Sequence, residues 1–279
     1  CDLLFPNPSD NSHFSNTYLN DLYYLADSSV ESHIPFLMAV RSRGFEEKEE
    51  SELFKLIEGV WIMHNICRRG KWNAMDNLYA SLCSSALDKS NDYEKIKSVF
   101  LKDSFQILFS SSSDHGEYNS QKFIDDFAKC MPLRVNQQRV ILRRIEQELA
   151  STTTELKENE IHVEHILPKK PAKSWPDFSD KEKHENYLNR LGNLTLLHSK
   201  LNIKISNSDF SKKKKEGFEE SKLKITNQLC EFKQWTAEEI DLRQLKMAQK
   251  VNSIWPYFDE LSKLDTDKYG HLVTTGEAE

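Results

Sequence analysis

A short β-branched run that ends at a proline is the feature that most constrains the fold of this chain. Ile161, Val163 and Ile166 lie close together, and β-branched side chains favour a strand. Pro168 follows at once, with another proline at Pro176. Because proline cannot donate to a sheet or continue a helix, regular structure must stop here. We therefore expect one short strand followed by an irregular loop.

A second short apolar run lies further along the chain. Residues 194–197 read Leu-Thr-Leu-Leu and follow Gly192, which suits a turn. After His198 the pattern becomes helical to about Ile205. The predicted order is strand, loop, strand and helix, which is the order of a ββα-metal finger.

The chain before this region has a helical pattern from about residue 16 to about residue 150. Residues 49–67 place apolar side chains at the i, i+3, i+4 spacing of a buried helix face, namely Leu53, Leu56, Ile57, Val60, Trp61 and Met63. Residues 136–149 repeat the pattern, with Arg143 and Arg144 expected to face outward. No part of this half alternates as a strand does. Residues 1–150 are therefore predicted to be a helical bundle.

A polar segment at residues 151–159 (STTTELKEN) predicts a boundary after this bundle. The second domain then covers residues 151–268, and a tail covers 269–279. Within the second domain, residues 210–230 are expected to form a helix with exposed lysines. Thr236 to Glu239 form a capping box that opens a long helix, whose inward residues are expected to be Ile240, Leu242, Leu245, Val251 and Ile254.

The predicted fold class is mainly α. It consists of an N-terminal helical bundle followed by an α+β domain that contains a ββα-metal finger flanked by helices. With 279 residues, the chain is long enough for two domains with separate cores. No apolar stretch approaches the roughly 18 residues that a membrane span requires, so no membrane association is expected.

The cysteines and the net charge exclude several classes of protein. Five cysteines without a Cys-x-x-Cys pair argue against a zinc ribbon or a disulfide framework, so a reducing, cytoplasmic setting is expected. The formal net charge of −6 argues against non-specific coating of nucleic acid. Between Lys200 and Lys224, however, eight lysines and four acidic residues give 8 − 4 = +4. Such a local basic stripe suits a site that meets phosphate in one place.

Four residues are candidates for contact with a phosphate: Lys204, Lys212, Lys213 and His198. The alternative for the lysine run 212–215 is a solvated helix face. His198 and the nearby His162 could equally be structural. His184, in a segment rich in lysine and glutamate, is expected to be solvated.

An acid and a histidine stand side by side at the end of the first predicted strand. Hydrolysis of a phosphodiester needs a base that activates water, and a neutral imidazole serves near pH 7, so we assign this role to His165. One hard divalent cation bound by oxygen ligands would neutralise charge at phosphorus. Glu164 is its expected anionic ligand and Asn202 its neutral ligand. Both strand neighbours reach one site only if the strand ends or bends there, which the break at Pro168 allows.

Asn193 follows Gly192 in the expected turn. Its amide can bond back to the first strand and fix the backbone that carries His165. The plainer alternatives are turn and cap roles for Asn193 and Asn202, and simple packing for His165. Their combination with the acid–histidine pair favours the catalytic interpretation.

Four motifs in this region together carry a family resemblance: HVEHILP, NRLGNLTLL, N-x-K-x-S-N-x-x-F-x-x-K and W-T-x-E-E-I-x-x-R. From about Ile161 to Trp255, the chain resembles the C-terminal HNH (His-Me finger) domain of GmrSD-type, modification-dependent restriction endonucleases. Related anti-phage effectors, including those coupled to DNA phosphorothioation, carry a similar domain. The preceding helices resemble the region that joins the two catalytic domains of such proteins.

This resemblance implies a divalent-metal DNA endonuclease that nicks or cuts double-stranded DNA in a phage-defence or modified-DNA restriction system. It places the base at His165, a structural asparagine of the catalytic group at Asn193, and metal ligands at Glu164 and Asn202. The implied cofactor is one ion of Mg²⁺ or Mn²⁺. Many such sites have Asp where this chain has Glu164.

The resemblance also implies partners. These are double-stranded DNA, possibly modified or phage-derived, and an N-terminal ParB-like nucleotide-hydrolysing domain of the same protein or of a partner subunit. The DGQR signature of that domain does not occur in this sequence, so no NTP site is expected here.

Two other functions stay open on the sequence. The finger could be the scaffold of a catalytically silent DNA-binding or sensing module, which Glu164 in place of Asp and the acidic net charge would favour. The helical half could be a platform that docks the missing NTPase domain, which is compatible with nuclease activity in the second half.

Overall fold

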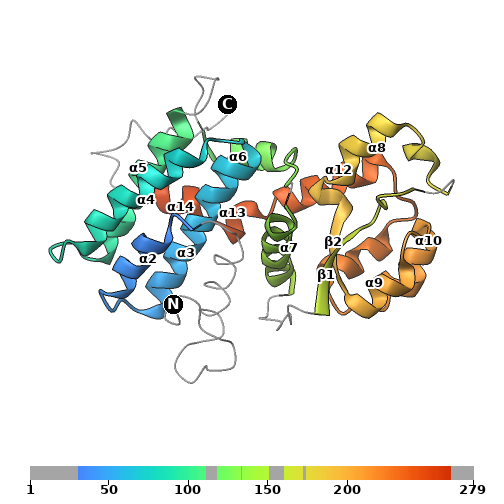
Figure 1. Cartoon of the computed structure of the whole chain (residues 1–279), viewed down its shortest axis with the longest axis horizontal. Coiled ribbons are helices and arrows are strands. Elements are labelled where there is room, and N and C mark those ends of the chain that lie inside the picture. The colour runs from blue at the N-terminus through green and yellow to red at the C-terminus, as the bar shows by residue number, and fades with distance from the viewer. Residues whose placement is uncertain (1–30, 111–117, 133, 151–159, 172–173, 265–279) are drawn as a thin grey trace. The chain divides into compact units, whose positions relative to one another are not determined.

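The computed structural model describes residues 31–110, 118–132, 134–150, 160–171 and 174–264. These residues are mainly helical, with one two-stranded sheet, as predicted (Figure 1). The chain divides into two compact units: the first is Cys1–Asp126 with Val251–Glu279, and the second is Phe127–Lys250. These bounds differ from the predicted ones, because residues 127–150 belong to the second unit and residues 251–264 to the first. The predicted linker and tail lie outside the described residues.

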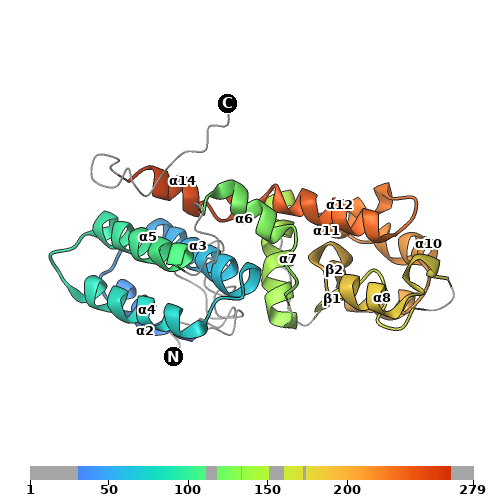
Figure 2. The same cartoon turned by 90° about the horizontal axis from the view of Figure 1, so that it is seen from above.

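The first unit is built from helices alone among its described residues: α2 (Ile34–Arg41), α3 (Glu47–Trp61), the π-helical turn η1 (Ile62–Cys67), α4 (Trp72–Leu87), α5 (Tyr93–Ser110), α6 (Ser120–Phe127), α13 (Val251–Ile254) and α14 (Tyr257–Ser262). A capping box between Glu46 and Glu49 starts α3. The predicted apolar stripe of α3 is buried, with Leu53, Leu56 and Val60 fully enclosed. Figure 2 shows α3 and α5 side by side, and the two helices are in contact.

Buried polar side chains in the first unit mostly bind other side chains. Lys97 Nζ lies 2.7 Å from Glu52 Oε1 and 2.5 Å from Glu260 Oε2. Trp255 Nε1 donates to Glu58 Oε2 over 3.0 Å, across 197 positions of sequence. These bonds join helices that are far apart in the chain.

The sheet of the second unit consists of β1 (Ile161–His165) and β2 (Leu194–His198). The helical segments around it are α7 (Val135–Ala150), η3 (Pro176–Phe178), α8 (Lys181–Leu188), η4 (Leu191–Asn193), α9 (Ser199–Ile205), α10 (Phe210–Lys213), η5 (Lys214–Phe218), α11 (Lys224–Asn227), η6 (Gln228–Glu231) and α12 (Ala237–Ala248). The strands β1 and β2 are antiparallel, and Ile161 pairs with His198 while His165 pairs with Leu194. Helix α9 follows β2 directly and contacts both strands (Figure 1).

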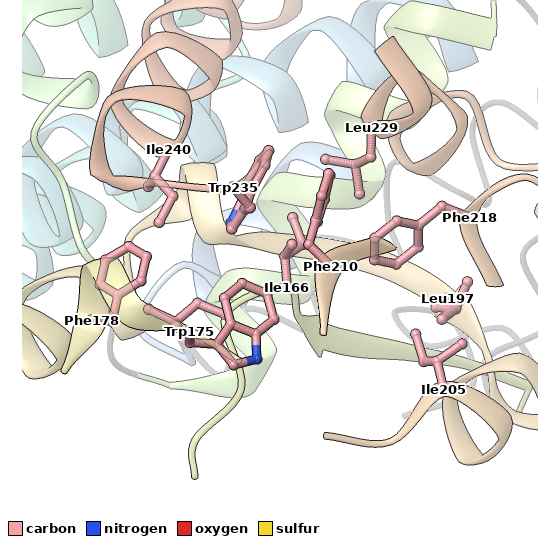
Figure 3. Packing of buried hydrophobic residues seen from close by; sticks show 11 residues of the cluster. Ile166, Trp175, Phe178, Leu197, Ile205, Phe210, Phe218, Leu229, Trp235 and Ile240 are labelled. Carbon is pink, nitrogen blue, oxygen red and sulfur yellow. The ribbon is translucent and has the colours of Figure 1, made fainter. Parts of the chain in front are cut away.

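The core of the second unit is an apolar cluster beside the hairpin (Figure 3): Ile166, Leu167, Trp175, Phe178, Leu197, Ile205, Phe210, Phe218, Leu229, Trp235 and Ile240. Phe210 stacks on Trp235 with ring centroids 5.3 Å apart. Trp175 comes from the proline-rich loop and is 4 % exposed, so it packs that loop against the core. Aromatic burial on this scale fixes an otherwise irregular segment.

Helix α12 begins with the predicted capping box of Thr236 and Glu239. Its inward face differs from the prediction: Ile240 is buried, but Leu242 and Leu245 are 48 % and 44 % exposed. Arg243 and Gln244 take the inward positions instead. Helical geometry places them on the same face as Ile240, three and four residues on, whereas Leu242 lies off that face.

Two further predictions are wrong. Arg143 and Arg144 do not face outward, because they are 1 % and 3 % exposed. Residues 210–230 do not form one helix: the chain breaks after η5, and α11 starts afresh at Lys224. The Glu146 carboxylate accepts hydrogen bonds from the backbone N–H groups of Lys224 and Ile225, which satisfies the start of the new helix.

None of the described helices combines the length and the apolar character needed to cross a bilayer.

Candidate functional site

The acid–histidine pair occupies the last two positions of β1. Glu164 pairs with Thr195 of β2, and His165 pairs with Leu194. Both side chains are half-buried. The strand ends at His165, and Leu167 turns the chain into the loop, so the break predicted from Pro168 is present.

Lys213 of α10 lies directly behind this pair. Its side chain is 1 % exposed, and its Nζ donates to Glu164 Oε1 over 2.5 Å and to the backbone oxygen of His165 over 2.7 Å. A single ammonium therefore holds both residues of the pair. This position does not fit the predicted phosphate contact for Lys213, because a buried, bonded ammonium cannot meet DNA on the surface.

Burial is the largest influence on the ionisation of this ion pair. It raises the pKa of Glu164 and lowers the pKa of Lys213, and each partner's charge opposes the shift of the other. The two side chains are held together by a short contact in a poorly solvated part of the second unit. Removing either partner would leave an isolated charge there.

His165 is oriented by Asn189, a residue that the sequence did not single out. His165 Nε2 lies 3.2 Å from Asn189 Oδ1. Because Oδ1 can only accept, Nε2 carries the proton and Nδ1 is left as the basic nitrogen. Burial lowers the pKa of His165, which favours the neutral imidazole. Asn189 ends α8, a place where asparagine is ordinary, so only the fold reveals this role.

Asn193 is fully buried, and its amide is saturated by hydrogen bonds. Oδ1 accepts from Leu167 N over 2.7 Å and from Trp235 Nε1 over 3.1 Å, while Nδ2 donates to the backbone oxygens of Leu167 and Leu188. Its own backbone oxygen accepts from Ile166 N over 2.9 Å. Asn193 thus fixes the chain just after His165, in the manner expected of a positioning residue. All hydrogen-bonding groups of its side chain are used, so the side chain cannot bind a substrate.

Asn202 lies on α9, at the edge of the helix face that meets the core. Leu201 and Ile205 of the same helix pack against the apolar cluster, whereas Ile203 is 79 % exposed. Asn202 falls between these two faces and is half-buried. Because α9 contacts both β1 and β2, Asn202 belongs to the same small substructure as Glu164 and His165.

The other predicted phosphate contacts are on the surface. Lys212 is exposed, and Lys204 Nζ forms an exposed ion pair with Glu220 Oε1 over 2.7 Å. His198 caps α9 by accepting from Lys200 N, and its Nε2 lies 3.3 Å from Glu160 Oε2. These residues are available to solvent, unlike Lys213.

His184 is also unlike its prediction. It is 8 % exposed rather than solvated, and its Nε2 lies 2.9 Å from the backbone oxygen of Pro168. His184 therefore ties α8 to the loop that follows the acid–histidine pair. Its neighbours in sequence are charged, so the local composition gave no sign of burial.

Position 192 requires glycine because its backbone lies very close to the backbone of α12. A Cβ on Gly192 would lie 2.1 Å from the backbone oxygen of Ile240, so no other residue fits without movement of α12. Arg243 Nη1 donates to the oxygens of Gly192 and Leu194, each over 2.7 Å. The turn that carries Asn193 is thus held from behind by α12.

Oxygen donors are what the site offers to a metal ion. Glu164 has a second carboxylate oxygen besides the one bound to Lys213, and Asn202 has an amide oxygen; such ligands suit a hard divalent cation that keeps several waters. Among the described residues, no group of three or more His, Cys, Asp or Glu side chains is placed to hold a metal. Carboxylate and amide oxygens are the ligands that hard cations such as Mg²⁺ and Mn²⁺ prefer.

Comparison with protein families identifies this part of the chain. Residues 117–250 match the family described as GmrSD restriction endonucleases, C-terminal domain, which is the family that the sequence motifs resemble. The match contains the whole of the candidate site. A domain of this family is a nuclease of the restriction type. No curated protein matches the chain.

Proposed function

We propose that this GmrSD-type C-terminal domain is an HNH endonuclease that nicks or cuts double-stranded DNA, with His165 as its general base. The observation that carries the proposal is the orientation of His165. Its Nε2 proton is directed to Asn189 Oδ1, which leaves Nδ1 free of a proton, and its backbone is held by Lys213. Cleavage of double-stranded DNA fits a restriction function, and the proposed target is DNA that is modified or of phage origin.

The hairpin β1–β2 and helix α9 support an interpretation as a ββα-metal finger. The two strands are antiparallel, α9 follows β2 without a gap, and the acid–histidine pair ends β1. In this arrangement the base and both oxygen donors come from two elements that contact each other, β1 for His165 and Glu164 and α9 for Asn202. Asn193 is a positioning residue in the proposal, since its amide bonds only to backbone and to Trp235.

The base performs the first chemical task. Nδ1 of His165 takes a proton from a water as its oxygen attacks phosphorus, and the imidazole becomes positively charged. Asn189 continues to accept from Nε2 and so keeps the ring in place. The bond from phosphorus to the 3′ oxygen breaks in the same displacement, and the leaving oxygen takes a proton from solvent water, which gives a 3′-hydroxyl and a 5′-phosphate.

One Mg²⁺ or Mn²⁺ held by Glu164 and Asn202 would supply charge neutralisation at the phosphate and at the leaving oxygen. Lys213 bonds one carboxylate oxygen of Glu164, and the other oxygen is the proposed metal ligand. Lys212, Lys204 and His198 lie on the surface of the second unit and are proposed to contact the DNA backbone.

The direct test is nicking of supercoiled plasmid in the presence of Mg²⁺. His165→Ala should reduce the rate by about 10²–10⁴-fold, because the general base is lost. His162→Ala is the matched control: His162 lies three residues away on the same strand and is exposed, so its loss should leave the rate unchanged. Equal cleavage by the parent and by His165→Ala would refute the assignment.

A second candidate is a DNA-binding or sensing module without cleavage activity. The contact of Lys213 with Glu164 favours it, because the ammonium already neutralises the carboxylate that a metal would need. Salt-dependent DNA binding without metal-dependent cleavage would support this candidate. An N-terminal ParB-like domain, on the same protein or on a partner, is the proposed companion in either case.

A further inference from the structure

Lys169 is the first exposed residue after the buried end of β1, and the backbone that leads to it is held in place. Residues 166–168 are all buried. Asn193 forms hydrogen bonds to the backbone of the first two, and His184 Nε2 lies 2.9 Å from the backbone oxygen of the third, Pro168. The chain therefore leaves the acid–histidine pair along a fixed path, which gives Lys169 a defined position just after the pair.

The ammonium of Lys169 acts on both members of the pair. Burial is the largest influence on the pKa of Glu164 and on the pKa of His165, and the positive charge of Lys169 lowers both pKa values. On His165, the charge of Lys169 has a larger effect than the charge of Lys213. Because such interactions weaken with distance, the ammonium lies near both side chains. The neighbouring Lys170 is also exposed but is not among the main charges that act on either one.

Lys169 differs from Lys213 in being free to bind an anion. The ammonium of Lys213 is buried and bonded to Glu164, so the charges of these two residues cancel. Lys169 is exposed, and no described residue forms a hydrogen bond or an ion pair with it. An exposed lysine is usually only solvated. This one, however, stands beside the proposed base with a compact positive charge that has no partner in the described part of the chain.

We propose that Lys169 contacts a non-bridging oxygen of the phosphate that is cleaved. This inference rests on the proposed function, since it gives Lys169 a role in the same displacement at phosphorus. The phosphate gains negative charge as the deprotonated water attacks, so a cation that touches it stabilises the transition state more than the bound substrate. The surface lysines proposed to contact the DNA backbone, Lys204 and Lys212, are not among the main charges that act on the acid–histidine pair.

Single-turnover nicking of supercoiled plasmid by the full chain with Mg²⁺ measures this role. Lys169→Met should slow the rate by about 10- to 100-fold, and Lys169→Arg, which keeps the charge, should stay within about fivefold of the parent. Lys170→Met is the matched control, because it removes the same charge from the next exposed position, and its rate should stay within about twofold of the parent. Equal rates for Lys169→Met and Lys170→Met would overturn the proposal and leave the nuclease assignment intact.

DNA binding in EDTA tests the contact without cleavage. A short fluorescent duplex is titrated with the full chain at several salt concentrations. Lys169→Met should lose about one unit of slope in log affinity against log salt, whereas Lys170→Met should keep the slope of the parent. An unchanged slope for Lys169→Met, or an equal loss from both variants, would overturn the proposal whatever the rate of nicking.

The two measurements separate this inference from the proposed function. If the parent binds DNA but does not nick it, the nuclease assignment fails, and the salt dependence alone decides whether Lys169 contacts a phosphate. A parent that does not bind DNA would overturn both.

Discussion

In the first unit, buried polar side chains join helices to one another, whereas in the second unit they hold the backbone of irregular segments. Lys97 binds the carboxylates of Glu52 and Glu260, on α3 and α14. Asn193 and Arg243, by contrast, bind mainly backbone N–H and C=O groups. Long helices satisfy their own backbone, so side chains are left to pair with side chains.

The second unit has long stretches that are neither helix nor strand, and its backbone groups need other partners. Those partners are the residues around the candidate site. The difference shows that the geometry of the acid–histidine pair depends on a few buried amide, ammonium and guanidinium groups, while the first unit depends on packing spread over many helical contacts. Single polar substitutions should therefore have larger effects in the second unit.

Asn193→Ala should have the largest effect on stability. Its loss leaves the Leu167 N–H and the Trp235 indole N–H buried without an acceptor, so we expect a loss of about 4 kcal/mol in the free energy of unfolding. Urea titration measures the change. Asn207→Ala, an exposed asparagine in the same unit, should change stability by less than about 0.5 kcal/mol. If both variants behave alike, the buried amide does not have the role assigned to it.

Lys213→Met should have the second largest effect on the free energy of unfolding. At neutral pH it leaves the Glu164 carboxylate without its cation, and breaking a buried pair typically costs about 3 kcal/mol. Adding Glu164→Gln should restore part of the loss, because the isolated charge is then removed. The neighbour Lys212→Met is the control, since Lys212 is exposed. A double variant as unstable as Lys213→Met alone would contradict the ion-pair explanation.

The first unit offers a contrasting prediction that depends on pH. His33 is 2 % exposed, and burial lowers its pKa from 6.5 to about 4. The unfolded chain then binds the proton more readily than the folded chain, so stability is fully present above pH 6.5 and falls as the pH drops toward 4. The shift corresponds to about 3 kcal/mol.

His33→Phe removes this titration while keeping a ring beside Tyr79, whose centroid lies 6.0 Å from that of His33. Urea midpoints measured at several values between pH 7 and pH 4 should fall less steeply for the variant than for the parent. Parallel curves for the two proteins would show that His33 is not the group responsible.

Lys212→Ala should have the smallest effect on stability, below about 0.5 kcal/mol, because its side chain is exposed. Its expected effect is on DNA binding: the dependence of log affinity on log salt should lose about one unit of slope if Lys212 contacts a phosphate. An unchanged slope would remove Lys212 from the proposed DNA surface and leave it as a solvated residue.

Much of the local structure could be predicted from the sequence, because it depends on short-range patterns. The β-branched run and Pro168 predicted β1 and its end, and Thr236 with Glu239 predicted the start of α12. The inward face of α12 was not predictable in this way. Leu242 and Leu245 are apolar but exposed, while Arg243 and Gln244 are buried because carbonyls and amides far away in the chain need donors and acceptors.

The residues of the candidate site also fall into two groups, those that the sequence predicts and those that only the fold reveals. Glu164, His165, Asn193 and Asn202 could be chosen from their motifs, and their catalytic roles stay predictions. Asn189 and the burial of Lys213 and His184 could not be chosen, since each sits in a polar stretch whose composition is typical of the surface.

The sequence by itself determined that this protein is mainly helical, that two short strands lie near Ile161 and Leu194, and which family motifs its second half carries. These properties follow from residue type and spacing along a few turns of chain. Only the tertiary structure decided which lysine is enclosed behind Glu164 and which asparagine orients His165. That choice depends on which backbone groups the fold leaves in need of a partner, and those groups come from segments distant in the sequence.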